Sequence, residues 1–402
     1  MSFPTPVLLG ADLNCYQLAR LLHEDYGVTS HAFGRYRLGE TTHSRIVRFC
    51  EIPDLWDEKT LLSVLEDFAR SHPRALLFGC TDAYVRMIAK HRARLAQQYL
   101  IPYGDAHFFA LASDKHAFGR ALAAHDLPTP TTAALTQDTD LSAIPFPQVL
   151  KAADSSAYYA HPFPSMRKAY LVQDADAVRK VEAEIRGGGY TGAILLQDYI
   201  PGDDTAMYVA NGYVDSNGCL RQLAIGHVLL QEHTPSGIGN PCAILTEPMP
   251  HLEALVKRVV DALPIRGLFN IDIRYDLRNR TYQILECNPR QGRSAYSTRA
   301  AGMSPIASAI DELVYGLPYR ETVTPPHSGY WYSVPPSVVK RHLPQDLKKA
   351  VAACERAGHQ AETLDYSFDL YKNPKRKRYL FLHRLSHHKK FYLYDRRRSV
   401  DL

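Results

Sequence analysis

The chain has 402 residues, 46% of them hydrophobic, which is enough for two or three domains with ordinary cores. No apolar run approaches the roughly 20 residues of a membrane span, and the first residues, MSFPTPVLLGADLN, do not have the pattern of a signal peptide. The 7 cysteines are scattered, without a CxxC pair or zinc-ligand spacing, which favours reduced thiols in a cytoplasmic protein.

The first part of the chain alternates short apolar runs with helical patterns. We expect strands at 6–10, 28–33 and 75–78, and helices ending at Tyr26 and covering 59–71. This alternation predicts a parallel α/β sheet that ends near residue 112. The domain is Rossmann-like in class, but Gly10 is not part of a GxGxxG dinucleotide fingerprint.

The middle of the chain has an α+β order instead. A helix over 113–127 is expected to begin at Ser113 or Asp114. The elements that follow are strands at 146–152 and 169–172, a helix at 174–186, strands at 193–197, 205–213 and 219–230, and a helix at 251–263.

A predicted hairpin comes next and is the most informative stretch of the chain. It reads GLFNIDIRYD, a short turn, then TYQILECNPRQGRS. Successive side chains on a strand point to opposite faces, so Asp272 and Arg274 share one face, and Glu286 and Asn288 share one on the second strand. If the hairpin is symmetric about Asn279, Asp272 lies directly opposite Glu286.

Two carboxylates placed as cross-strand neighbours repel each other. A divalent cation between them reverses the sign, and oxygen ligands from Asp, Glu and Asn suit Mg²⁺ shared with substrate phosphates. An ordinary sheet with one solvated face also alternates polar and apolar residues. Here, however, the polar face carries two acids, two amides and an arginine. The hairpin therefore favours a magnesium-nucleotide site.

The strand ending in Glu286-x-Asn288-Pro289-Arg290, with Asp272 on its neighbour, resembles the metal-binding strands of the ATP-grasp ligases. The resemblance implies ATP and two Mg²⁺ ions, with Asp272, Glu286 and Asn288 as the metal ligands. It covers roughly residues 1–320 and implies three regions there: a Rossmann-like domain at 1–112, a small lobe at 113–190, and a large lobe with the metal and substrate site at 191–320. The remaining residues, 321–402, are expected to form a basic C-terminal extension.

Two lysines match the phosphate-binding pair of this family. Lys115 stands in Ser-Asp-Lys, and Lys151 ends a strand in Leu-Lys-Ala-Ala-Asp, where the family commonly has Pro in place of the first Ala. Such lysines are usually only solvated, but an ammonium suits phosphate oxygens. The loop 154–168 resembles the family's flexible phosphate loop without its glycines, which makes Ser155 and Ser156 candidates and adds the charge of Lys168.

The segment QDYIPGDD resembles the one that runs along adenine and ribose in the family. A strand followed by a Pro-Gly turn is the simpler interpretation. By resemblance, the adenine and ribose positions are Gln197, Tyr199, Ile200 and Asp204.

The sequence NPRQGRS, with a tyrosine shortly after it, resembles the D-aspartate ligase branch of the ATP-grasp carboxylate–amine ligases. An arginine fork matches a carboxylate with two hydrogen bonds, so one arginine suits phosphate and another suits a substrate carboxylate. The candidate catalytic residues are Arg290, Arg293 and Lys151. The candidate substrate residues are Arg274, Arg290, Arg293, Ser294 and Tyr296.

The resemblance implies a ligase that converts the β-carboxylate of D-aspartate into an acyl phosphate. The acceptor amine is then the lysine side chain of a peptidoglycan precursor, a UDP-MurNAc-pentapeptide. A ligase for another amino acid or a dipeptide fits the same motifs. A non-catalytic nucleotide or nucleic-acid binder is a third possibility, but the complete set of acids and lysines argues against it.

The C-terminal charge is a separate feature. Residues 366–402 hold 11 Lys and Arg against 3 Asp, with aromatic residues interleaved. This segment therefore has a net charge of +8, and the rest of the chain sums to −3, which gives the total of +5. A solvated surface is the first interpretation, and a contact with an anionic substrate or an anionic membrane leaflet is the second. Nucleic-acid binding comes last, and no nucleic acid is expected as a partner. The motifs do not specify the oligomeric state.

Overall fold

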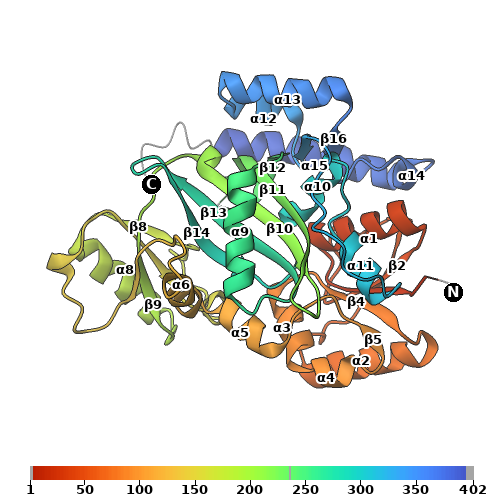
Figure 1. Cartoon of the computed structure of the whole chain (residues 1–402), viewed down its shortest axis with the longest axis horizontal. Helices are drawn as coiled ribbons and strands as arrows, with labels where there is room; N and C mark the ends of the chain where they lie inside the picture. The colour runs from red at the N-terminus through yellow and green to blue at the C-terminus, as the bar shows by residue number, and fades with distance from the viewer. Residues whose placement is uncertain (1–2, 235–236, 395–402) are drawn as a thin grey trace.

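The computed structural model describes residues 3–234 and 237–394, with all of their side chains except those of Ser155 and Ser156. Its strands form three sheets, and helices pack around them (Figure 1). A parallel sheet comes first along the chain, then a small antiparallel sheet, then a large and mostly antiparallel sheet. The α/β and α+β fold class expected from the sequence is therefore confirmed.

The N-terminal sheet has five parallel strands in the order β3-β2-β1-β4-β5. Its strands are β1 (Pro6–Leu9), β2 (Ser30–Gly34), β3 (Val47–Glu51), β4 (Ala75–Gly79) and β5 (Tyr99–Leu100), and its helices are α1 (Leu13–Tyr26), α2 (Glu58–Ser71), α3 (Asp82–Lys90) and α4 (Arg92–Leu95). Strands β2 and β4 lie on either side of β1. The strand order therefore reverses between β1 and β4, which leaves a crevice at their carboxyl ends.

Two helices, α5 (Ala106–Ser113) and α6 (Lys115–Ala123), lead from this sheet to the next. Asp114 caps α6, because its Oδ1 accepts hydrogen bonds from the backbone N–H groups of His116 at 2.9 Å and Ala117 at 3.0 Å. The expected cap is confirmed, and Lys115 is held in the first turn of the helix.

The small sheet is antiparallel, in the order β6-β9-β7-β8. Its elements are β6 (Thr132–Ala134), η1 (Leu141–Ala143), β7 (Gln148–Ala152), α7 (Ser155–Tyr159), β8 (Tyr170–Val172), α8 (Ala175–Gly187) and β9 (Ile194–Asp198). The short helix α7 lies in the segment that the sequence analysis treats as a loop.

The large sheet has seven strands in the order β14-β13-β10-β11-β12-β15-β16, and only β15 and β16 pair in parallel. Its elements up to residue 320 are η2 (Asp204–Ala206), β10 (Met207–Val214), β11 (Leu220–Gln231), β12 (Pro241–Thr246), α9 (Pro250–Ala262), β13 (Gly267–Asp276), β14 (Thr281–Asn288), η3 (Arg293–Tyr296), α10 (Ser297–Ala300) and α11 (Ala307–Leu313).

Helix α9 covers one face of the large sheet (Figure 1). Val256 and Val259 of α9 share a buried cluster with Ile271 and Ile273 of β13. Side chains alternate along a strand, so the intervening Asp272 faces away from α9. The polar face of β13 is thereby turned toward the N-terminal sheet.

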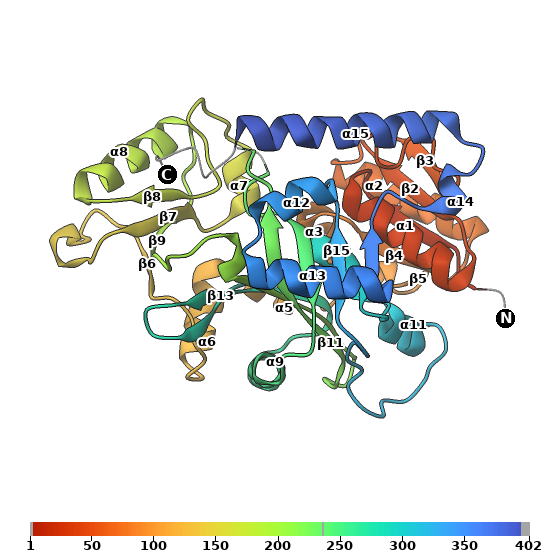
Figure 2. The same cartoon turned by 90° about the horizontal axis from the view of Figure 1, so that it is seen from above.

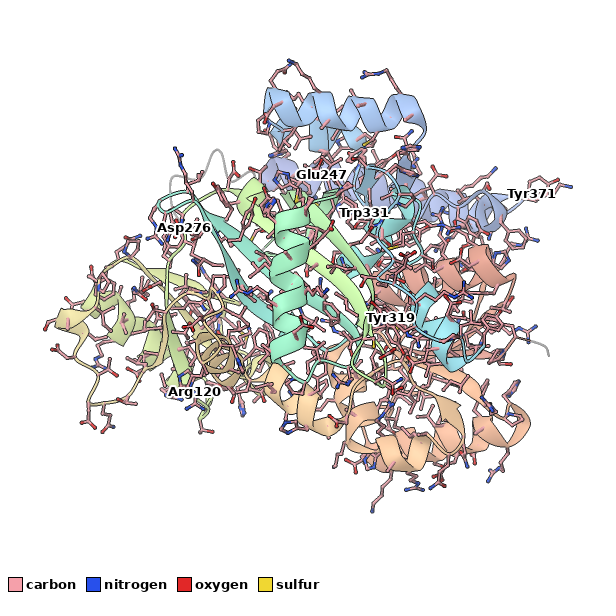
Figure 3. The ribbon with its side chains drawn as sticks, viewed as in Figure 1. Arg120, Glu247, Asp276, Tyr319, Trp331 and Tyr371 are labelled. Carbon is pink, nitrogen blue, oxygen red and sulfur yellow. The ribbon has the colours of Figure 1, made fainter. Side chains whose placement is uncertain are left out.

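The segment after residue 320 is built into the fold. Its elements are β15 (Gly329–Tyr332), α12 (Pro336–His342), α13 (Gln345–Ala357), β16 (Gln360–Glu362), α14 (Ser367–Leu370) and α15 (Pro374–Leu393). Trp331 of β15 is fully buried, and its Nε1 donates a hydrogen bond to Thr363 Oγ1 at 2.8 Å (Figure 3). Arg376 of α15 is 1% exposed. The basic C-terminal segment is therefore packed against the rest of the fold up to residue 394.

The cysteines and the hydropathy of the helices bear on two further expectations from the sequence. All seven cysteines are free, and five of them are buried, as expected for reduced structural thiols. In the two described ranges, no helix combines the length and the apolar character needed to cross a membrane.

Candidate functional site

Strands β13 and β14 place the predicted metal ligands side by side. Asp272 pairs with Glu286, and Asn270 pairs with Asn288. The turn covers residues 277–280, so the hairpin is not centred on Asn279. A one-residue bulge at Leu285 restores the pairing that the symmetric hairpin predicts. The predicted pairing of Asp272 with Glu286 is thus correct, but it depends on the bulge and not on a hairpin centred on Asn279.

The two acids line a cleft of about 410 Å³ where the three sheets meet. The hairpin and its continuation form one wall, and the ends of β1 and β4 form another. Residues from the small sheet and from the loop between β11 and β12 complete it. Polar lining residues outside the hairpin include Asp12, Asn14, Thr81, Asp82, Arg86, Asp154, Lys168 and Asn240.

The acid pair is electrostatically unbalanced. Burial, and next the charge of Glu286, raise the pKa of Asp272 to about 7. The charge of Lys115, by contrast, holds the pKa of Glu286 well below its usual range. Glu286 therefore carries the negative charge, and Asp272 tends to keep its proton. A second charge is disfavoured here unless cations approach.

Lysines surround the pair. Lys115 Nζ lies 3.2 Å from Glu286 Oε2. Burial acts to lower the pKa of Lys115, but the charge of Glu286 outweighs it and raises the pKa. Lys151 Nζ donates a hydrogen bond to Gln197 Oε1 at 2.9 Å, and burial lowers its pKa to about 8, with Lys115 and Lys168 acting in the same direction. The mutual repulsion of these lysines suits a polyanionic ligand.

A buried amide network supports the metal end of the hairpin. Asn288 Nδ2 donates to Asn270 Oδ1 at 3.1 Å. Asn270 Nδ2 donates in turn to Asn211 Oδ1 and Ser294 Oγ, both at 3.2 Å. Ser294 also donates to Asn211 at 3.2 Å. The network fixes Ser294 and the side chain of Asn288. Because Nδ2 of Asn288 is the donor, its side-chain oxygen Oδ1 is left as a potential metal ligand.

The arginines after β14 reach across the cleft to the N-terminal sheet. Arg290 Nε and Nη2 form a fork on Asp82, at 2.6 and 3.0 Å. Arg293 Nη2 lies 3.7 Å from Asp12 Oδ2, which is too long for a hydrogen bond. Asp12 also accepts a hydrogen bond from the backbone N–H of Cys15 as the cap of α1. Arg290 is thus fully engaged, and Arg293 is the arginine better placed to bind a ligand.

Gln291, between the two arginines, anchors this segment. Its Nε2 donates to the carbonyl oxygen of Gly79 at 2.8 Å, and its Oε1 accepts from the Tyr103 hydroxyl at 2.9 Å. Gln291 is 3% exposed. Gln291 therefore ties the arginine segment to the end of β4, a role that no motif in the sequence indicates.

The predicted adenine and ribose segment joins the small sheet to the large one. Arg274 donates hydrogen bonds to the carbonyl oxygens of Ile200 at 2.8 Å and Gly202 at 2.5 Å. Asp204 Oδ2 accepts from the backbone N–H of Gln231 at 2.9 Å and lies 2.9 Å from His233 Nε2. The segment is held against β11 and β13.

The structure brings one part of the predicted set together in the cleft. The predicted residues that line it are Lys115, Asp272, Glu286, Asn288, Arg290, Arg293 and Ser294. The predicted residues outside its lining are Lys151, Gln197, Tyr199, Ile200, Asp204, Arg274 and Tyr296. Tyr296 is fully buried and donates its hydroxyl to Glu24 Oε2 at 3.2 Å. The side chains of Ser155 and Ser156 lie outside the described part of the chain.

Two acids of the cleft, Asp12 and Asp82, have no role in the sequence analysis. Each follows a buried strand, in PVLLGAD and ALLFGCTD. Ligands of open α/β sheets bind outside the carboxyl ends of the strands where the strand order reverses. The rule makes acids at the carboxyl ends of predicted parallel strands candidates, but the choice of these two strands requires the strand order.

The residues present fit the implied magnesium. A half-buried cross-strand acid pair, in which one acid has a strongly raised pKa, is relieved by a divalent cation. Within residues 3–234 and 237–394, no three His, Cys, Asp or Glu side chains group as a metal site. Two acids, one amide and phosphate oxygens are nevertheless the donor set that Mg²⁺ takes beside a nucleotide.

Comparisons with known proteins extend this result. No family model matches the chain. A D-aspartate ligase of Enterococcus faecium (strain Aus0004) is 28% identical over 363 residues, which cover 86% of each protein. An L-amino acid ligase of Bacillus licheniformis superposes with a TM-score of 0.57 at 15% identity, covering 78% of this chain and 74% of that one.

A second similar structure is the biotin carboxylase domain of the Hydrogenobacter thermophilus 2-oxoglutarate carboxylase, crystallised with MgADP and bicarbonate. It superposes with a TM-score of 0.61 at 13% identity, covering 81% of this chain and 73% of that one. At these identities the similarity of structure defines the fold alone. The chain has the ATP-grasp fold.

Proposed function

We propose that this chain, an ATP-grasp carboxylate–amine ligase, activates the β-carboxylate of D-aspartate and joins it to an amine of a peptidoglycan precursor. The lysine side chain of a UDP-MurNAc-pentapeptide is the amine we favour. The observation that carries the proposal is the acid pair of Asp272 and Glu286 beside Lys115, in a cleft that continues to arginines. The similarity to a D-aspartate ligase along 86% of the chain supports the choice of amino acid.

The metal and phosphate end of the site uses the hairpin. We assign Asp272, Glu286 and Asn288 as ligands of Mg²⁺, with two ions expected. Bound Mg²⁺ would neutralise phosphate charge and stabilise the charge that develops on the transferred phosphoryl group. Lys115 Nζ, which lies 3.2 Å from Glu286 Oε2, would contact phosphate oxygens once a cation took its place beside that carboxylate. Lys151 adds a second ammonium.

The nucleotide base and ribose are assigned to the connection between the small and large sheets. Gln197, Tyr199, Ile200 and Asp204 are the residues we propose there, with backbone groups of Tyr199 and Ile200 facing adenine. Arg274 supports this segment through its hydrogen bonds to the carbonyl oxygens of Ile200 and Gly202. We therefore treat Arg274 as a positioning residue in the nucleotide site.

The amino-acid end of the site suits an amino dicarboxylate. Arg293 offers a guanidinium to a carboxylate, because its ion-pair partner Asp12 is 3.7 Å away. Asp12 offers a carboxylate to an ammonium group, and burial raises its pKa, which a cation would reverse. Arg290, forked on Asp82, lends positive charge to the acyl phosphate. Tyr296 is buried away from the cleft, so we leave it out of the site.

The chemistry needs no nucleophilic side chain. The β-carboxylate attacks the γ-phosphate of ATP, ADP leaves, and an acyl phosphate forms. The deprotonated amine attacks the acyl carbon, phosphate leaves, and an amide forms. The protein contributes position and charge stabilisation. The fixed elements that hold Lys115, Glu286 and Arg293 supply the positioning.

The assay is amine-dependent release of ADP with D-aspartate as the acid. Glu286→Ala should abolish it, because the variant removes a metal ligand and the partner of Lys115. Glu286→Gln, which keeps the shape of the side chain, should also be inactive. Gln283→Ala lies on the same strand outside the cleft and should retain activity. Undiminished turnover in either Glu286 variant rejects the metal assignment, provided circular dichroism shows a folded protein.

A ligase of the same fold for a different amino acid is the second candidate. The similarity to an L-amino acid ligase structure favours keeping it in view. Phosphate release across a panel of D- and L-amino acids distinguishes the two candidates. The proposal predicts the highest kcat/KM for D-aspartate, and a higher value for a monocarboxylic amino acid would reverse the ranking.

A further inference from the structure

Helix α15 (Pro374–Leu393) lies along one side of the molecule, from the N-terminal sheet toward the small sheet (Figure 2). It is fixed by a single buried face. Arg376, Leu380, His387 and Phe391 are the buried residues of the helix, spaced by four, seven and four positions. That spacing defines one stripe along a helix. The opposite stripe therefore points away from the body of the protein.

One line of side chains on the outward face is apolar. Phe381 is 61% exposed, Leu385 is 50% exposed and Tyr392 is 59% exposed, and their spacing places them on one line. Leu382 and Leu393, 51% and 59% exposed, lie further round the same face, beyond Arg378 and Lys389. Large apolar side chains gathered on one exposed face, rather than scattered singly, mark an interaction surface.

Positive charge borders this stripe. Lys375, Lys377, Arg378 and Lys389 are exposed, and none of them forms an ion pair with a described residue. The helix contains no Asp or Glu. Several acids from other elements are paired with cations of α15: Asp369 with Arg376, Glu362 and Asp365 with Arg384, and Glu232 with Lys390. The outer face therefore combines an apolar line with cations beside it, and the helix itself adds no acid.

We propose that the outer face of α15 docks the protein onto an anionic membrane surface. Phe381, Leu385 and Tyr392 enter the boundary between headgroups and acyl chains, and the bordering cations contact lipid phosphates. A helix that presents an apolar face with Lys and Arg beside it lies in the plane of such an interface. Juxtamembrane lysines and arginines add attraction to anionic lipid.

Other occupants fit this face less well. A second copy of the chain would set one acid-free cationic border against another, and like charges oppose such a contact. A nucleic acid would meet the cations and could stack on Phe381 and Tyr392, but it would leave the exposed Leu382, Leu385 and Leu393 without an apolar partner. A membrane is the partner that uses the apolar and the cationic parts together.

Docking would bring the cleft near the membrane. The ring centroid of Phe391 lies 5.1 Å from that of His233, and Lys390 approaches Glu232. Both partners lie at the start of the loop whose residues 238–241 line the cleft. Membrane docking through α15 would place the protein at the membrane surface whichever substrates it uses.

The test is co-sedimentation of the full chain with lipid vesicles. The protein should sediment with vesicles that are about one third phosphatidylglycerol, and not with phosphatidylcholine alone, and binding should weaken as salt rises. Phe381→Ser combined with Leu385→Ser leaves the charge unchanged and should reduce binding more than tenfold. Leu277→Ser combined with Leu317→Ser, which removes exposed apolar side chains elsewhere, should bind like the unaltered chain.

A second pair of variants isolates the charge. Lys377→Glu with Lys389→Glu should reduce binding about tenfold or more, whereas Lys59→Glu with Lys180→Glu, an equal charge change elsewhere, should have a much smaller effect. ADP release in solution should be unchanged in all four double variants, which separates this test from that of the ligase activity. No binding to anionic vesicles, or equal losses in test and control variants, overturns the proposal. Self-association through α15 in place of vesicle binding would do so as well.

Discussion

Replacing Asp272 by Asn should give a protein that is more stable and inactive. Asp272 faces Glu286 across the hairpin, and ionising both acids without a cation is unfavourable. An amide keeps the size of the side chain and removes the charge. In the absence of nucleotide and metal, the variant should therefore unfold at a higher temperature than the unaltered chain. In their presence it should not turn over.

The magnitude follows from the pKa of Asp272, which is raised from 3.8 to about 7 by burial and by Glu286. About three pKa units correspond to about 4 kcal/mol. The side chain is partly exposed in the cleft, and solvent screening reduces the expected gain to about 2 kcal/mol. For a protein domain of this size, such a gain in free energy of unfolding raises the unfolding temperature by a few degrees.

The pH dependence has a definite sign. Below pH 3.8 the carboxyl is protonated in both the folded and the unfolded chain, so Asp272 costs nothing. As the pH rises from 3.8 to 7, the unfolded chain releases its proton first, and folded-state stability is lost. Above pH 7 the loss is complete. The advantage of Asp272→Asn should be full above pH 7 and should fade toward pH 4.

Thermal unfolding with EDTA at several pH values measures this effect. Asp276→Asn is the matched control, because Asp276 lies on the same strand near the hairpin turn (Figure 3) and bonds Arg278 through both oxygens. The Arg278 bonds lower the pKa of Asp276, so its Asn variant should be less stable. An Asp272→Asn protein that is no more stable at pH 8, or whose gain is the same at pH 5, refutes the reasoning.

Two further predictions concern the arginines. Arg293→Lys should raise the KM for the amino acid about tenfold, because lysine lacks the fork for a carboxylate, and should leave the KM for ATP little changed; an equal rise in both would argue against a substrate role. Arg376→Met should lower the free energy of unfolding by about 3–5 kcal/mol, because it leaves Asp369 buried without the Nε that lies 3.3 Å away. Urea unfolding measures the effect of Arg376→Met. The double variant that also carries Asp369→Leu should recover part of the lost stability. An unchanged urea midpoint in the single variant would contradict a stabilising role of the Arg376–Asp369 pair.

The sequence predicted the strands and helices with regular periodicity. The hairpin, α9 and the parallel strands β1 and β4 all have strong apolar patterns, and each was placed within a few residues. The pairing of Asp272 with Glu286 was also correct. The bulge at Leu285 could not be predicted, because a one-residue bulge depends on how the strand packs and leaves no pattern in composition.

The C-terminal segment was the least predictable part. Its charge suggested a solvated surface, yet α15 is held by Arg376, whose guanidinium lies over the Tyr16 ring at 4.4 Å and bonds the carbonyl of Gly39 at 2.9 Å. These partners are more than 300 residues away in the chain. Local periodicity carries no information on such contacts, so a buried arginine in a basic helix looks the same as a solvated one.

The sequence predicted the wall of the cleft that the hairpin forms, but not the opposite wall that the N-terminal sheet forms. Lys115, Glu286 and Arg293 were singled out by motif, and all three line the cleft. Asp12 and Asp82 come from the N-terminal sheet, and their position depends on the strand order β3-β2-β1-β4-β5. Strand order is set by tertiary packing, so a single sequence does not reveal that these acids meet the arginines.

The most direct test of the account is the product itself. The unaltered chain, with ATP, Mg²⁺, D-aspartate and a peptide that bears a free lysine side chain, should form one new amide and one ADP for each turnover. Mass spectrometry detects the amide, and a coupled assay counts the ADP. Equal amounts of amide and ADP, both absent with Glu286→Ala, are the predicted result. ADP without amide, or no amide with any amino acid and amine supplied, would contradict the account.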